Sequence, residues 1–238
     1  MKDTRAGLSA GKTSSGTSFK KEGIITVVSG LPRSGTSMMM KMLDMGNMPL
    51  LIDNIRTADT DNPRGYYEFE PVKTMESDNS WLEKARGRAV KIVSPLLEHL
   101  ALDVNLRYKI IFMIRKIDEV LASQRKMVER LNKGGDAIKD NTLKQNYASH
   151  LDKTKKLLAE NKHIDVIYIN YSDVISEPLA VSETVSRFLG TDLNTEKMAM
   201  AIDQSLYRQR IHNTGEGPDP ACTEDEAISE RLKHLGYL

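Results

Sequence analysis

Short apolar runs recur along the chain, separated by longer segments in which apolar and polar residues alternate at helical spacing. The four runs lie at 24–30 (IITVVSG), 88–94 (RAVKIVS), 108–115 (YKIIFMIR) and 164–171 (IDVIYINY). Apolar runs of this length without alternation are typical of strands buried on both faces of a parallel sheet. We therefore predict four central parallel strands.

The segments between these runs predict helices. The expected helices run from the loop after residue 30 to about Gly46, from Asp118 onward, over 143–161, and over 182–190. The last of these is closed by Gly190, a residue type that favours helix ends. Strands that alternate with helices predict an α/β fold with three layers, α/β/α, around a central parallel sheet.

Composition narrows the classes of protein that fit this pattern. The chain has 238 residues, which suits one α/β domain with a sizeable core. Its net charge of +1 favours no nucleic-acid partner, so any anion site must come from a local cluster of basic residues. A single cysteine, Cys222, excludes an internal disulfide and a cysteine-rich metal site. No run of about 18 apolar residues predicts a membrane span, and we expect a cytoplasmic protein.

Three regions differ in character. Residues 1–22 are rich in Ser, Thr, Gly and Lys, and we expect them to form a disordered tail. The tail contains Gly11-Lys12-Thr13, which nearly matches a nucleotide-binding loop, but no buried strand precedes it, so we interpret the match as coincidence. Residues 23–212 form the expected domain, and residues 213–238 form a C-terminal extension of it with no role that the sequence assigns.

The stretch LPRSGTS (31–37) links the first predicted strand to the first helix. This is the layout of a phosphate-binding loop, in which backbone N–H groups and the first helical turn bind an anion, so we expect a P-loop-type domain. The loop has Gly35-Thr36 where nucleotide-cleaving loops have Gly-Lys, which argues against chemistry on a triphosphate. The amides from Ser34 to Ser37, two hydroxyls and the guanidinium of Arg33 would instead bind one terminal anionic group. The alternative is a tight strand-to-helix turn without a ligand.

This stretch resembles the loop of the sulfotransferases, Pro-Lys/Arg-Ser-Gly-Thr-Ser/Thr. In that family the loop holds the 5′-phosphosulfate of 3′-phosphoadenosine 5′-phosphosulfate (PAPS), the sulfuryl donor. The resemblance implies that PAPS binds to Arg33, Ser34, Gly35, Thr36 and Ser37, and that no metal is required.

A second motif supports the resemblance. Arg115 ends a predicted strand, and Ser123 follows eight residues later in the next predicted helix. The family places such a pair on the 3′-phosphate, and a guanidinium beside a hydroxyl is a physically reasonable anion pocket. The alternative for Arg115 is an ion pair with a surface carboxylate such as Asp118 or Glu119.

The resemblance extends from Ile24 to Gly190. The stretch VIYINYSDVISEPLAVSETVSRFLG is similar to a later strand, turn and helix of the family, and VKIVSPLL is similar to Lys-Thr-His-Leu-Pro of its cytosolic members, with Lys91 and Pro95 in register. The resemblance implies that Lys91, with Arg33 and the loop amides, stabilises the charge of the leaving group. The alternative for Lys91 is a snorkelling lysine at a strand end.

The general base is where the chain departs from the cytosolic members, because Val93 occupies the position of their histidine. Other branches of the family use a glutamate between the loop and the lysine strand. The stretch DNPRGYYEFEPVK offers two carboxylates there, of which Glu68 is the first candidate and Glu70 the second. The alternative is that they pair at the surface with Arg64 or Lys73.

Two other sets of residues have open roles. Arg208 and Arg210 in SLYRQR are candidate contacts to the 3′-phosphate by analogy with a late basic segment of the family, or they form a solvated basic face. Tyr66, Tyr67 and Trp81 line an acceptor pocket or pack in the core.

The expected function is transfer of a sulfuryl group from PAPS to a hydroxyl or amine of a small-molecule, lipid or carbohydrate acceptor, with release of 3′,5′-adenosine bisphosphate. One alternative is a P-loop kinase or nucleotide phosphotransferase, which would need the Gly-Lys-Thr of the tail. Another is a non-catalytic PAPS-binding protein that has both anion pockets and no working base. The sequence assigns neither the acceptor nor the oligomeric state.

Overall fold

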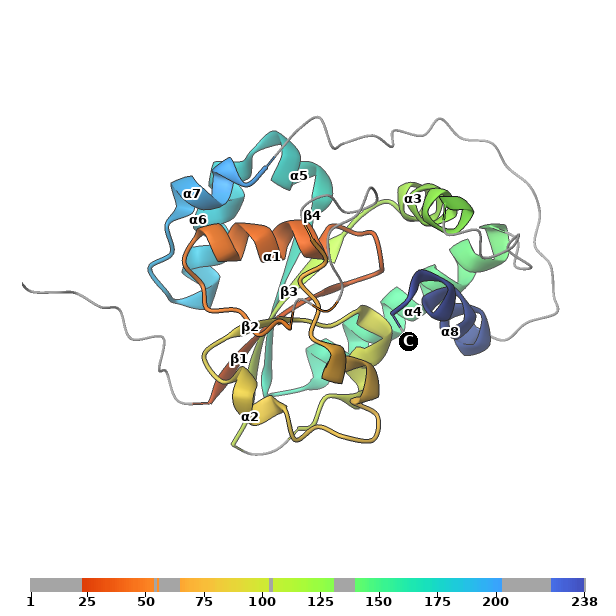
Figure 1. Ribbon diagram of the computed structural model, residues 1–238, viewed down its shortest axis with the longest axis horizontal. Helices are drawn as coiled ribbons and strands as arrows, with labels where there is room; N and C mark the ends of the chain where they lie inside the picture. The colour runs from red at the N-terminus through yellow and green to blue at the C-terminus, as the bar shows by residue number, and fades with distance from the viewer. Residues whose placement is uncertain are drawn as a thin grey trace, which may run out of the picture.

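Four parallel strands form the sheet of the computed structural model, which describes residues 23–53, 55, 65–102, 105–130, 140–202 and 224–237. In spatial order the strands are β2, β1, β3 and β4 (Figure 1). Their bounds are Ile24–Gly30 for β1, Ala89–Lys91 for β2, Arg107–Ile114 for β3 and Ile164–Asn170 for β4. The prediction of four parallel strands is confirmed.

Alternate residues of the strands supply two hydrophobic clusters, one on each face of the sheet. Val27 and Phe112 point into the larger cluster, whereas Val28 and Ile111 point into the smaller one. All four side chains are fully buried, as expected for central strands covered on both faces.

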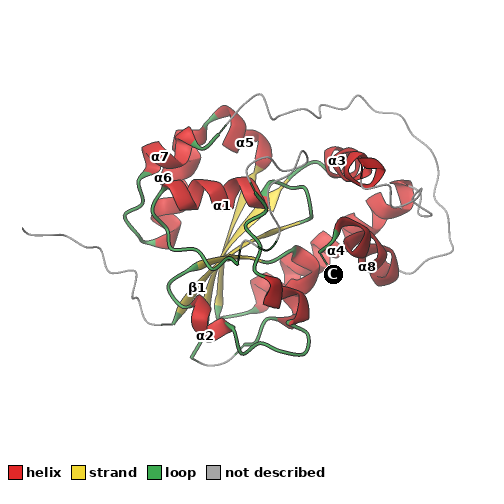
Figure 2. Cartoon of the chain, in the orientation of Figure 1, coloured by secondary structure: helices red, strands yellow, loops and turns green. Residues whose placement is uncertain are grey.

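Helices cover both faces and make the three layers that the sequence predicts (Figures 1 and 2). The smaller cluster lies under α1 (Thr36–Met45), α5 (Tyr171–Ser176), α6 (Pro178–Leu189) and α7 (Thr195–Met200). The larger cluster lies under α2 (Leu82–Ala85), α3 (Ile117–Arg130), α4 (Asp140–Glu160), α8 (Glu224–Leu235) and the 3-10 helices η1 (Glu70–Thr74) and η2 (Ser94–His99).

Strand β2 is shorter than the apolar run at 88–94 predicts. It ends at Lys91, and η2 begins at Ser94 with Pro95 in its first turn. Proline has no N–H to donate to a strand ladder, and its fixed φ suits the start of a helix. The apolar residues Ile92 and Val93 are buried all the same, so they support the core without extending the strand.

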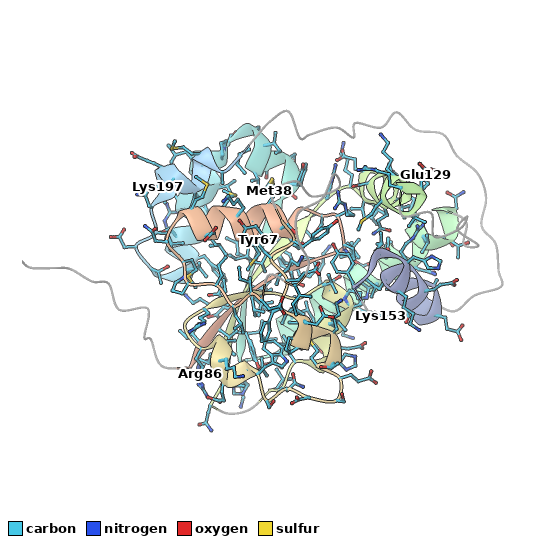
Figure 3. All side chains as sticks on the ribbon, in the orientation of Figure 1. Met38, Tyr67, Arg86, Glu129, Lys153 and Lys197 are labelled. Atoms are coloured by element: carbon cyan, nitrogen blue, oxygen red, sulfur yellow. The ribbon has the colours of Figure 1, made fainter. Side chains whose placement is uncertain are left out.

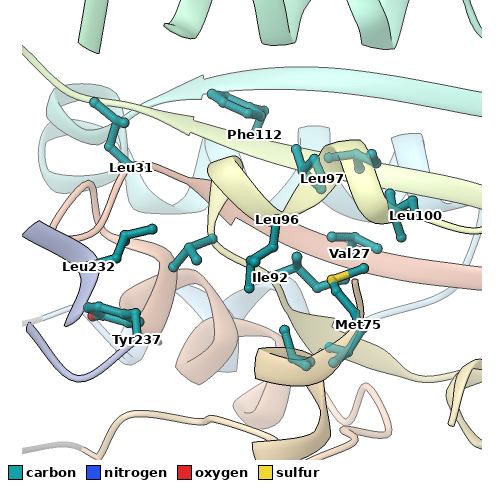
Figure 4. Packing of buried hydrophobic residues seen from close by; sticks show 14 of the residues in the cluster. Val27, Leu31, Met75, Ile92, Leu96, Leu97, Leu100, Phe112, Leu232 and Tyr237 are labelled. Atoms are coloured by element: carbon teal, nitrogen blue, oxygen red, sulfur yellow. The ribbon is translucent and has the colours of Figure 1, made fainter. Parts of the chain in front are cut away.

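The C-terminal segment, to which the sequence assigned no role, belongs to the larger core cluster. Its helix α8 buries Ile228, Leu232 and Leu235, and Tyr237 follows the helix with 6% of its surface exposed. Figure 4 shows Leu232 and Tyr237 in the same cluster as Leu31, which directly follows β1. Residues 224–237 are therefore part of the same folded unit as the sheet.

The strand order places the carboxyl ends of β1, β2 and β3 at one edge of the sheet. Strand β1 pairs in parallel with β2 on one side and with β3 on the other, so the chain leaves β1 at a point where the strand order reverses. Ligands of open α/β sheets bind in the crevice at such a point. The loop after Gly30, Lys91 at the end of β2 and Arg115 after β3 all lie at this edge.

We predict that Gly30→Ala destabilises the fold more than Gly190→Ala. Both glycines have positive φ, +144° and +68°, so both substitutions carry backbone strain. At Gly30 an added Cβ would lie 2.5 Å from Ser34 Oγ and 2.6 Å from the Met113 carbonyl oxygen, whereas at Gly190 the nearest atom is 3.8 Å away. The free energy of unfolding, measured in urea, should fall by about 1–3 kcal/mol more for Gly30→Ala. Equal losses of unfolding free energy in the two variants would show that the loop shifts to accommodate the added methyl group.

Candidate active site

The loop between β1 and α1 exposes a helix N-terminus at the carboxyl edge of the sheet. Gly35 is the N-cap residue of α1 in a left-handed conformation (φ +105°), and no side chain caps the helix. A Cβ at this position would lie 2.7 Å from the ring of Tyr171, so both backbone conformation and space require glycine. The first N–H groups of an uncapped helix have no intrahelical partner and form a ready site for an anion.

Two hydroxyl-bearing residues of the loop are buried beneath this helix end. Ser34 and Thr36 have 1% and 4% of their surfaces exposed. Within the described residues, Ser34 Oγ has no hydrogen-bond partner. A buried hydroxyl without a partner costs free energy, so this oxygen is available to a ligand bound in the loop.

The structure joins the loop to the second predicted motif. Arg33 has an unusual φ of +75°, and its Nε donates a hydrogen bond to Ser123 Oγ on α3 (3.1 Å). The Arg33 carbonyl accepts a hydrogen bond from Arg115 Nη1 (3.1 Å). The three residues that the sequence assigned to two separate pockets therefore form one continuous polar cluster.

Arg115 also makes the ion pair that the alternative interpretation anticipated. Its Nε donates to Glu119 Oε2 at 3.0 Å, and both side chains are more than nine-tenths buried. The guanidinium carbon lies 4.2 Å from the centre of the Tyr171 ring. Asp118, the other carboxylate considered, pairs with Lys144. Arg115 is therefore held rigidly by a carboxylate and an aromatic face.

Sequence reasoning missed Gln124, which holds the loop from below. Its Nε2 donates to the Pro32 carbonyl at 3.0 Å, and its Oε1 accepts from the Tyr147 hydroxyl of α4 at 3.0 Å. Gln124 is fully buried. A single glutamine in a helix belongs to no recognisable motif. The available sign of its role in the sequence was its position directly after Ser123.

Lys91 lies at the centre of a second cluster, at the end of β2. Its side chain is 2% exposed, and its Nζ lies 3.0 Å from Glu68 Oε1 and 3.5 Å from Ser37 Oγ. The ammonium also donates to the Tyr66 carbonyl, which accepts a second hydrogen bond from Ser37 Oγ (3.1 Å). This buried ammonium therefore connects a carboxylate to the first turn of α1.

The two candidate bases have different surroundings. The Glu68 side chain is 9% exposed and pairs with Lys91, whereas the Glu70 side chain is 45% exposed and pairs with Lys73 at 3.0 Å. The backbone changes conformation between them, because Phe69 is extended and the 3-10 helix η1 begins at Glu70. Of the two, Glu68 is the carboxylate beside the loop.

The aromatic residues near these carboxylates differ in their contacts. Tyr67, labelled beside α1 in Figure 3, donates its hydroxyl to Asp44 Oδ2 at 3.3 Å. Trp81 packs edge-on against Phe69 with ring centres 5.8 Å apart, which is a core contact. Tyr66 is 1% exposed.

Some predicted residues lie outside the described part of the chain. These are Arg64, Arg208, Arg210 and the Gly11-Lys12-Thr13 stretch of the tail. Among the described residues, no group of three or more His, Cys, Asp or Glu side chains could hold a metal ion. No helix in the described ranges is long and apolar enough to cross a membrane.

The site combines an uncapped helix start after a glycine loop with basic side chains at the switch point of an α/β sheet. Comparison with known families is more specific, since the model of the sulfotransferase domain matches residues 25–212. The chain therefore belongs to the sulfotransferase family, as its resemblance predicted. No curated protein matches its sequence significantly.

Solved structures similar to this chain are also sulfotransferases. The sulfotransferase domain from the Synechococcus PCC 7002 olefin synthase has 14% identity and a TM-score of 0.47, over 91% of this chain and 95% of that chain. The sulfotransferase domain from the curacin biosynthetic pathway has 14% identity and a TM-score of 0.46, over 89% and 98%. Mouse sulfotransferase SULT7A1 complexed with PAP has 16% identity and a TM-score of 0.44, over 76% and 63%.

We predict that Gln124→Met weakens the fold through the loop. The substitution removes the hydrogen bonds of Gln124 with the Pro32 carbonyl and the Tyr147 hydroxyl, so the free energy of unfolding in urea should fall by about 1–3 kcal/mol. Lys126→Ala, an exposed change on the same helix, is the matched control and should stay within about 0.5 kcal/mol of the parent. A Gln124→Met protein as stable as the control would show that the loop does not depend on this amide.

Proposed function

We propose that this chain transfers a sulfuryl group from PAPS to a hydroxyl or amine of a small-molecule, lipid or carbohydrate acceptor. The observation that carries the proposal is the position of the Lys91 ammonium, which contacts both the Glu68 carboxylate and the Ser37 hydroxyl of the phosphate loop. A cation that stabilises a leaving group and a carboxylate that accepts a proton are the two groups that this reaction needs.

The residues present fit a donor with anionic groups at two positions. The uncapped N-terminus of α1 and the buried, unpartnered Ser34 hydroxyl offer hydrogen bonds to a phosphosulfate. Arg115 and Ser123, which both contact Arg33 of the loop, offer a guanidinium and a hydroxyl to a 3′-phosphate. PAPS supplies the sulfuryl group and leaves as 3′,5′-adenosine bisphosphate.

Lys91 stabilises negative charge as it develops on the leaving oxygen. Its ammonium is nearly excluded from water, and electrostatic interactions are stronger in such surroundings than in solvent. The contact with Ser37 Oγ places the Lys91 ammonium beside the first turn of α1. Arg33 and the loop amides would stabilise the same developing charge.

Glu68 takes the proton of the acceptor. Its carboxylate is 3.0 Å from the Lys91 ammonium, and this contact fixes its orientation. The histidine of the cytosolic members is replaced by Val93, a buried residue that has no proton acceptor. The acceptor oxygen or nitrogen would therefore approach on the Glu68 side of Lys91.

The direct test is transfer of radiolabelled sulfate from PAPS to a panel of alcohols, amines, lipids and oligosaccharides. We expect labelled product with at least one class and none when labelled ATP replaces PAPS. Transfer from ATP would favour the kinase alternative. Binding of PAPS without transfer to any acceptor would favour the non-catalytic binding protein.

We predict that Glu68→Gln lowers kcat by about 10²- to 10⁴-fold, the contribution typical of a general base. The amide can still accept a hydrogen bond from Lys91, so bisphosphate affinity should stay close to that of the parent. Glu76→Gln, an exposed change, is the matched control. Steady-state kinetics of Glu70→Gln distinguishes the two candidates: loss of kcat in this variant with normal kcat in Glu68→Gln would assign the base to Glu70.

A further inference from the structure

The Lys91 ammonium lies near the faces of two aromatic rings that come from distant parts of the chain. Its Nζ is 5.8 Å from the ring centre of Tyr66 and 5.6 Å from that of Tyr237. Both distances fall within the range of about 6 Å over which an aromatic face attracts a cation. Tyr66 precedes Glu68 in the segment before η1, and Tyr237 follows α8.

These two rings suit the task of a cation in catalysis. Burying an ammonium costs free energy unless nearby groups compensate for its lost hydration. A second carboxylate would compensate, but it would also compete with the developing negative charge of the leaving group. Aromatic faces attract the ammonium and exclude water while adding no full negative charge.

We propose that Tyr237 is a positioning residue for Lys91, so that docking of the segment after α8 completes the catalytic site. The proposal rests on the leaving-group role of Lys91 in the proposed function. It assigns to the C-terminal segment a part in the reaction that goes beyond its part in the core.

The backbone after α8 holds Tyr237 in place. Gly236 has a φ of +77°, and the Tyr237 amide donates to the Leu232 carbonyl at 2.9 Å, a turn that ends the helix. Leu232 and Leu235 anchor the helix, with 2% and 0% of their surfaces exposed. Figure 4 shows the Tyr237 ring beside Leu232, at the end of the cluster where Leu31 enters the phosphate loop.

The rival explanation is that Tyr237 only fills space in the core. In that case, any loss of activity on substitution would follow the loss of stability, and the electron density of the ring would be irrelevant. A series of Tyr237 variants separates these explanations. The series comprises Tyr237→Phe, Tyr237→Leu, and phenylalanines with one, two or three ring fluorines at position 237, since fluorination weakens the attraction for a cation with little change in size.

We expect kcat to fall stepwise with the number of fluorines and to drop by about threefold to thirtyfold in Tyr237→Leu, the range of a buried cation–aromatic interaction. Tyr237→Phe should retain kcat within about threefold, and the affinity for 3′,5′-adenosine bisphosphate should change less than about twofold throughout. Ile228→Ala, which removes buried surface from α8, is the control for packing. It should lower the unfolding midpoint while leaving kcat near the parental value.

A second readout does not depend on activity. With isotope-labelled lysine, the ε-methylene protons of Lys91, assigned by their absence in Lys91→Arg, should show an upfield ring-current shift that decreases in Tyr237→Leu. If the parent protein transfers no sulfate from PAPS, the proposed function fails, and this shift still tests the placement of the ring. A kcat that does not change with the number of ring fluorines would overturn the proposal. So would an Ile228→Ala variant that loses as much kcat as Tyr237→Leu.

Discussion

Parallel pairing of β1 with β2 on one side and β3 on the other is the constraint on which the site depends. Register places Val28 beside Lys91 and Gly30 beside Met113, so the three strands end at nearly the same level. The loop after β1, Lys91 and Arg115 then meet at one edge, although they lie far apart in the sequence. A strand shift of one residue would turn Lys91 toward the opposite face of the sheet.

Two buried ion pairs give this edge its electrostatic character. Arg115 with Glu119 and Lys91 with Glu68 each place a cation beside a carboxylate, with every one of the four side chains at most 9% exposed. Such pairs contribute little net stability, because desolvation offsets attraction, but they fix positions and exclude water. Both cations also face an aromatic ring. The two charges are therefore desolvated and oriented before an anionic ligand binds.

The sequence predicted the features that depend on local pattern. Apolar runs predicted the four strands, helical spacing predicted the helices, and the loop motif predicted an anion site where the structure has the uncapped start of α1. Contacts between residues that are far apart in the sequence leave no local pattern. Gln124 bonds Pro32 across 92 positions, and Tyr237 lies near Lys91 although it is close to the other end of the chain. The sequence offered Glu68 and Glu70 as candidates two residues apart, whereas the turn into η1 at Glu70 gives them different environments. Such turns depend on tertiary packing.

The central claim is that one continuous polar cluster binds a nucleotide with anionic groups at both its 5′ and 3′ positions. Calorimetric titration of the purified protein with 3′,5′-adenosine bisphosphate, 5′-AMP and ATP with magnesium tests it most directly. The account predicts that the bisphosphate binds about 10- to 100-fold more tightly than 5′-AMP, the worth of charged hydrogen bonds to one additional phosphate. Equal affinity for the bisphosphate and 5′-AMP, or tighter binding of ATP with magnesium, would contradict it.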